Sequence, residues 1–184
     1  MNTPNMLTLL RVIMVPIFMW ALLSGFYWAA IIIFALASLT DQLDGYLARK
    51  NNQVTTFGKL MDPLADKILT ISALVCLLGI GADFINSWVI MIIIARELIV
   101  TGVRQLAMGE NTVIAASSWG KAKTVSQMAA IIAVMLDLAL GNMLRYGDAW
   151  WGALTFWLVA LAVALTVYSG LDYIVKNRRL ITFK

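Results

Sequence analysis

The sequence predicts an all-α integral membrane protein with six transmembrane helices and with both termini in the cytoplasm. Of the 184 residues, 61% are hydrophobic and only 13% are charged, and the mean hydropathy is +0.85. A soluble domain has roughly 25% charged residues, so this composition is typical of a membrane protein. The apolar residues form segments close to the roughly 20 residues that a helix needs to cross a bilayer.

Six apolar segments follow one another along the chain. The expected spans are Met6 to Leu23, Tyr27 to beyond Leu39, Leu60 to Ile80, Trp88 to about Leu106, Thr124 to Leu140, and Trp150 to about Ile174. The first lacks the basic start and the cleavage site of a signal peptide, so we interpret it as a span. Because the spans use almost every long segment, residues 1–184 are predicted to form one membrane domain.

The basic residues give the expected orientation. They flank the second and fourth connections and fill the C-terminal tail: Arg49, Lys50, Lys59, Lys67, Lys121, Lys123, Lys176, Arg178, Arg179 and Lys184. The first and third connections have no Lys or Arg, and the fifth has only Arg145. By the positive-inside rule, the second and fourth connections face the cytoplasm of a multi-pass protein in the cell membrane. The net charge of +4 fits a lipid surface and predicts no nucleic-acid partner.

The rare residue types exclude several kinds of chemistry. The sequence has no histidine, so His-based hydrolase and zinc sites are excluded. Its single cysteine, Cys76, excludes an internal disulfide and is expected to be a buried structural thiol. Proton transfer and metal binding therefore depend on carboxylates, lysines, tyrosines or the backbone.

Carboxylates gather between the second and third segments, at a membrane boundary where they are costly. On helices they form two stripes that also contain small residues: Asp41, Asp44, Gly45 and Ala48, then Gly58, Asp62 and Asp66. Small residues let two helix backbones approach closely, so the four aspartates can converge. Pro63 allows a helix that begins at Asp62 or one that begins near Thr55. We favour the earlier start because it aligns Gly58 with the aspartates.

Four converging carboxylates would repel one another without a countercharge. A set of oxygen ligands suits Mg²⁺ or Mn²⁺, and Mg²⁺ favours sites where substrate phosphates complete its shell. Arg49, one turn after Gly45, is placed to hold a phosphate. The alternative is a set of ordinary interfacial charges in a solvated loop, which the helical spacing and the small residues disfavour.

The stretch resembles the signature of the CDP-alcohol phosphatidyltransferase family, D-x2-D-G-x2-A-R-x8-G-x3-D-x3-D, at every position. The resemblance implies an enzyme that displaces CMP from a CDP-linked lipid with an alcohol. It implies that Asp41, Asp44, Asp62 and Asp66 bind one or two Mg²⁺ or Mn²⁺ ions, with two expected. Asp66 would also be the general base. The expected CDP-lipid ligands are Asn5, Thr8, Gly45, Ala48, Arg49 and Gly58. A homodimer is likewise implied.

Segments 4–11, 95–104 and 119–128 resemble the branch of this family whose substrates are CDP-diacylglycerol and glycerol 3-phosphate. Arg104, Lys121 and Lys123 are the expected ligands of the glycerol 3-phosphate phosphate group. Two alternatives concern these charges: Arg96 and Glu97 lock helices together by ion pairing, or the basic residues anchor lipid headgroups. Another alcohol acceptor also remains open. A cation transporter is disfavoured, because it needs carboxylates near the bilayer midplane.

Overall fold

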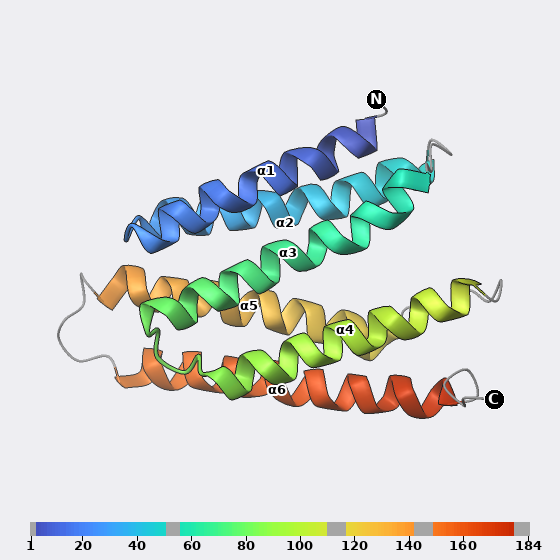
Figure 1. The fold of residues 1–184 in the computed structure, drawn as a ribbon. Helices are drawn as coiled ribbons and strands as arrows, with labels where there is room; N and C mark the ends of the chain where they lie inside the picture. Colours follow the sequence, from blue (N-terminus) through green and yellow to red (C-terminus); the bar gives the residue numbers. More distant parts are fainter. Residues whose placement is uncertain (1–2, 51–55, 110–116, 142–148, 179–184) are drawn as a thin grey trace. The chain divides into compact units, whose positions relative to one another are not determined.

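The computed structural model is entirely helical in the part of the chain that it describes, which is 3–50, 56–109, 117–141 and 149–178. Side chains are described for 9–39, 67–105, 107, 117–141 and 150–178. Six helices follow in order: α1 (Thr3–Leu23), α2 (Tyr27–Lys50), α3 (Thr56–Ile80), α4 (Ser87–Gly109), α5 (Ser118–Gly141) and α6 (Ala149–Lys176). Figure 1 labels these helices and colours them along the chain, from blue at the N-terminus to red at the C-terminus. The prediction of six helices is confirmed.

Local hydrogen bonds explain where several helices begin and end. Gly25, with φ of 80°, follows α1, and the backbone N–H of Phe26 donates to the carbonyl of Ala21 at 2.9 Å. Gly81, with φ of 74°, ends α3 in the same way. Both are left-handed caps, which glycine adopts without steric cost. The predicted turns after the first and third segments therefore lie where expected.

α5 begins earlier than the expected start at Thr124. The side chain of Ser117 accepts a hydrogen bond from the backbone N–H of Gly120 at 3.1 Å, as an N-cap residue does. Lys121 and Lys123 consequently lie in the first turns of a helix and not in a connection. The apolar pattern missed this turn because its residues are polar.

The contacts divide the chain into two compact units. The first consists of Met1–Ala82 and Leu138–Arg145, so it contains α1, α2 and α3. Within it α1 contacts both α2 and α3. Its core includes Phe18 and Phe34, whose ring centroids are 5.7 Å apart, together with Leu74 and Leu77.

The second unit consists of Asp83–Asp137 and Tyr146–Lys184 and contains α4, most of α5, and α6. α4 and α6 lie side by side (Figure 1). Val100 and Val103 of α4 form a buried cluster with Tyr173 of α6. Two small polar residues of α6, Thr166 and Ser169, are also fully buried.

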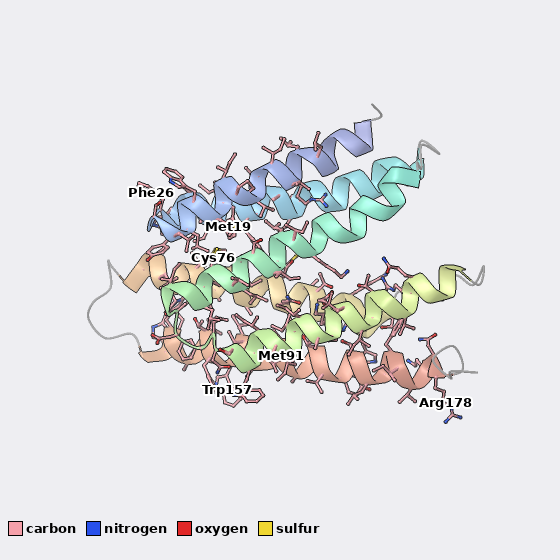
Figure 2. All side chains as sticks on the ribbon, in the orientation of Figure 1. Met19, Phe26, Cys76, Met91, Trp157 and Arg178 are labelled. Atoms are coloured by element: carbon pink, nitrogen blue, oxygen red, sulfur yellow. The ribbon has the colours of Figure 1, made fainter. Side chains whose placement is uncertain are left out.

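The outward surfaces of the helices are apolar, as a lipid environment requires. Trp157 on α6 projects outward and is 68% exposed, and Met91 on α4 is 63% exposed (Figure 2). Among the described residues, Ser118–Gly141 and Trp150–Lys176 are long and apolar enough to cross a membrane. Shorter apolar helical stretches occupy Leu9–Leu23, Tyr27–Leu39 and Lys67–Ile80. These helices are consistent with a membrane protein.

Candidate active site

The aspartate stretch lies on two helix ends of the first unit. Asp41 and Asp44 belong to the last three turns of α2, and Asp62 and Asp66 to the first three turns of α3. Only residues 51–55 separate the two helices, so both ends lie at the same end of the unit. The backbone therefore places each pair of aspartates on a helix, as the predicted convergence of the four carboxylates requires.

α3 begins at Thr56 and continues as a helix through Pro63. This confirms the earlier of the two predicted starts. Gly58, Asp62 and Asp66 consequently occupy positions i, i+4 and i+8 of one continuous helix.

The side chains of this region lie outside the described set. This applies to all four aspartates and to Asn5, Thr8, Gly45, Ala48, Arg49 and Gly58. Among the side chains that are described, no three His, Cys, Asp or Glu residues gather as metal ligands. The predicted metal and CDP-lipid sites thus stay predictions from the sequence and the resemblance.

A second group of charges lies within the second unit, and its side chains belong to the described residues. Glu97 on α4 accepts a hydrogen bond from the ammonium of Lys123 on α5, and Arg96 Nη1 lies 3.4 Å from the same Glu97 Oε1 atom. The side chains of Glu97 and Lys123 are only 14% and 4% exposed. We call Arg96, Glu97, Lys123 and Arg104 the charge cluster.

Arg96 is held from two other helices. Its Nη2 donates to the hydroxyl of Ser169 on α6 at 3.2 Å. A Cβ atom added at Gly120 of α5 would lie 3.7 Å from the same nitrogen, so the first turn of α5 also approaches the guanidinium. α4, α5 and α6 therefore meet at Arg96.

Arg104 lies two helical turns after Arg96 on α4. Its guanidinium carbon stands 5.8 Å from the ring centroid of Tyr173 on α6, within cation–π range. Three buried polar atoms near these residues have no hydrogen bond to the described part of the chain: Arg96 Nε, Arg104 Nε and Tyr173 Oη. Buried polar atoms are normally satisfied, so these three are candidate contacts of a ligand.

Lys121 differs from Lys123. The side chain of Lys121 is exposed, whereas that of Lys123 is buried. Residues two apart on a helix point in directions that differ by about 200°. The structure therefore brings Lys123 to Glu97 and leaves Lys121 on another side of α5.

Residues 1–168 match the family model for CDP-alcohol phosphatidyltransferase. The chain belongs to the CDP-alcohol phosphatidyltransferase family. The match extends across both units, so it includes the aspartate stretch and the charge cluster.

Several relatives within the family are similar over almost their full length. A Bacillus subtilis protein named CDP-diacylglycerol–glycerol-3-phosphate 3-phosphatidyltransferase is 40% identical, with 96% of this chain and 95% of the relative aligned. A Haemophilus influenzae protein of the same name is 36% identical over 94% and 91% of the two chains. One from Salmonella typhimurium is 35% identical over 94% and 93%.

Two residues of this phosphatidyltransferase that contact the charge cluster, Ser169 and Tyr173, were not predicted from the sequence. Both lie on α6, and with Thr166 they occupy positions i, i+3 and i+7 of a predominantly apolar helix. This spacing of polar groups on one face is a signal that sequence reasoning could have used. Only the structure shows that Arg96 and Arg104 lie against it.

Proposed function

We infer that this phosphatidyltransferase transfers the phosphatidyl group of CDP-diacylglycerol to sn-glycerol 3-phosphate. The products are phosphatidylglycerophosphate and CMP, in the synthesis of glycerophospholipids. The observation that carries this inference is the near full-length similarity to relatives named for this reaction. The complete aspartate signature supports the same chemistry.

The charge cluster supports a role in binding the acceptor phosphate. Among these four described side chains, Arg96, Arg104 and Lys123 are cationic and Glu97 is a carboxylate, so the four together carry two more positive than negative charges. A phosphate monoester carries about two negative charges at neutral pH. The cluster is therefore matched in charge to the phosphate of glycerol 3-phosphate.

The unsatisfied atoms support the same assignment. Arg96 Nε and Arg104 Nε are donors, and Tyr173 Oη can donate as well. Phosphate oxygens accept several hydrogen bonds at once, and arginine binds them in a planar geometry. We assign Arg104 and Lys123 to the acceptor phosphate, whereas the exposed position of Lys121 lends this role no support.

The aspartates are proposed as the metal site. Four carboxylates provide only oxygen ligands, and the continuous helix through Asp62 and Asp66 keeps those two on one face. This donor set fits Mg²⁺ or Mn²⁺, which would neutralise charge on the diphosphate of the CDP-lipid. Asp41, Asp44, Asp62 and Asp66 would hold two ions. Asp66 would accept the proton of the attacking hydroxyl, since no histidine is available.

The orientation in the cell membrane is part of the proposal. Basic residues at the second and fourth connections and in the tail favour cytoplasmic termini and a cytoplasmic active site. There the enzyme meets a soluble acceptor while the acyl chains of CDP-diacylglycerol stay in the bilayer. The family resemblance supports a homodimer.

An acceptor panel tests the reaction. Protein purified in detergent with Mg²⁺ or Mn²⁺ and CDP-diacylglycerol should release CMP only after glycerol 3-phosphate is added. Removal of metal with EDTA should stop the release, and Mn²⁺ or Mg²⁺ should restore it. CMP release with serine or inositol phosphate in place of glycerol 3-phosphate would overturn the acceptor and keep the family.

Arg104→Gln tests the acceptor-phosphate site. Loss of a charge-assisted hydrogen bond should raise the KM for glycerol 3-phosphate by about tenfold to a hundredfold. The KM for CDP-diacylglycerol should change little. Arg178→Gln is the matched control, because Arg178 is an exposed arginine beyond the end of α6. Equal KM values for glycerol 3-phosphate in Arg104→Gln and the wild type would remove Arg104 from the site.

A further inference from the structure

Arg96 is the residue at which three helices meet, and its surroundings on α6 are unusual. A Cβ atom added at Gly170 would lie 3.0 Å from Arg96 Cγ and 3.9 Å from Arg96 Cβ. The aliphatic stem of Arg96 thus rests directly on the backbone of α6. This contact would be tighter than nine in ten real Cβ contacts, so a larger residue at 170 requires the Arg96 stem to shift by a few tenths of an ångström.

The neighbouring residue holds the other end of the same side chain. Ser169 is fully buried, accepts a hydrogen bond from Arg96 Nη2 at 3.2 Å, and donates to the carbonyl of Thr166 at 3.2 Å. Because the Ser169 hydroxyl donates to its own helix, its lone pairs are turned to the guanidinium. Gly170 therefore seats the stem and Ser169 orients the head.

The orientation of Arg96 extends to Lys123 through Glu97. Glu97 Oε1 is shared by Arg96 Nη1 and the Lys123 ammonium. The Arg96 hydrogen bonds, at 3.2 and 3.4 Å, are already near the upper limit of useful length, so a small shift of the guanidinium would break them. Such a shift would remove one of the two cations that share Glu97, and so change the surroundings of the carboxylate that pairs with Lys123 on α5.

We propose that Ser169 and Gly170 are positioning residues that set the guanidinium of Arg96, and through Glu97 the ammonium of Lys123, for the acceptor phosphate. This inference rests on the proposed acceptor site. Neither residue contacts substrate in this proposal, and each acts through Arg96.

A groove next to Arg96 gives its side chain room to move when residue 170 is larger than glycine. A groove of about 250 Å³ between α4 and α6 is lined by apolar side chains such as Ile99, Val167 and Leu171, and by Arg96 itself. In Gly170→Ala the added methyl group can push the Arg96 stem toward this groove. The helices can then stay packed while the guanidinium moves.

Steady-state kinetics on four variants tests the proposal. Gly170→Ala and Ser169→Ala should each raise the KM for glycerol 3-phosphate about tenfold, the cost of a lost hydrogen bond to a charged group, with the KM for CDP-diacylglycerol unchanged. Gly152→Ala on α6 and Gly102→Ala on α4 are matched controls that should keep wild-type KM values. An added Cβ would meet nothing nearer than 3.9 Å at Gly152 and nothing within 4 Å at Gly102.

A double variant separates positioning from general damage. If Ser169 acts through Arg96, Ser169→Ala should add nothing to the KM increase of Arg96→Lys. Additive increases, an equal rise of both KM values, or a wild-type KM for glycerol 3-phosphate in Ser169→Ala would overturn the proposal. The Ser169 series decides the question even if Gly170→Ala does not fold. Wild-type protein that releases no CMP with glycerol 3-phosphate would instead overturn the proposed function.

Discussion

Asp66→Asn is expected to lower CMP release by about a thousandfold or more, because it removes the proposed general base, which is also a proposed metal ligand. The amide keeps the size of the side chain but can neither accept the proton nor carry the negative charge. Since Asp66 lies within the first turns of a continuous α3, the fold should survive. Release of labelled CMP measures the effect, and size-exclusion chromatography and thermal unfolding in detergent verify the fold.

The matched control for this prediction is Asp83→Asn. Asp83 is an exposed carboxylate in the turn between α3 and α4. It should keep normal turnover, because the change in charge is the same but the position is outside the signature. Near-normal turnover in Asp66→Asn would remove Asp66 as the base and leave the reaction to another group.

The second large effect concerns stability. Glu97→Gln is expected to lower Tm in detergent by about 10 °C, because removal of one partner of a buried ion pair costs about 3 to 5 kcal/mol. The buried Lys123 and the partly buried Arg96 lose their shared carboxylate in this variant. Lys123→Met should cost less, since Glu97 keeps Arg96 as a counterion. The double variant should lose less stability than the sum of the two single losses.

Asp172→Asn is the control for the stability measurement. It breaks the i,i+4 pair between Asp172 and Lys176 on α6, in which the Lys176 side chain is 62% exposed. Exposed pairs contribute at most about 1 kcal/mol, so Tm should fall by no more than about 4 °C. A Glu97→Gln variant as stable as this control would show that the cluster does not hold α4 to α5.

Arg96 and Glu97 make contacts between helices, as the helix-locking alternative expects. Glu97 on α4 pairs with Lys123 on α5, and Arg96 on α4 donates to Ser169 on α6. The role of the cluster at the acceptor phosphate stays a proposal.

Much of the fold followed from simple patterns. Long apolar segments predicted the six helices, and the glycines after the first and third segments predicted their ends. The predicted start of the fifth segment, at about Thr124, was too late, because polar residues continue the helix. α5 starts at Ser118, since capping and backbone hydrogen bonds do not depend on apolar side chains. α2 extends to Lys50 and so contains the predicted helical stripe of Asp41, Asp44, Gly45 and Ala48.

The candidate site divides in the same way. The sequence alone determined the aspartate signature, because its members lie at short helical spacings within two consecutive segments, and family membership followed from it. It could not determine that Glu97 pairs with Lys123, 26 residues away, or that Arg96 reaches Ser169, 73 residues away. Helices that are apolar on nearly every side carry little information about which face meets a neighbour. Only the tertiary structure sets the rotation of α4, α5 and α6 that places these side chains together.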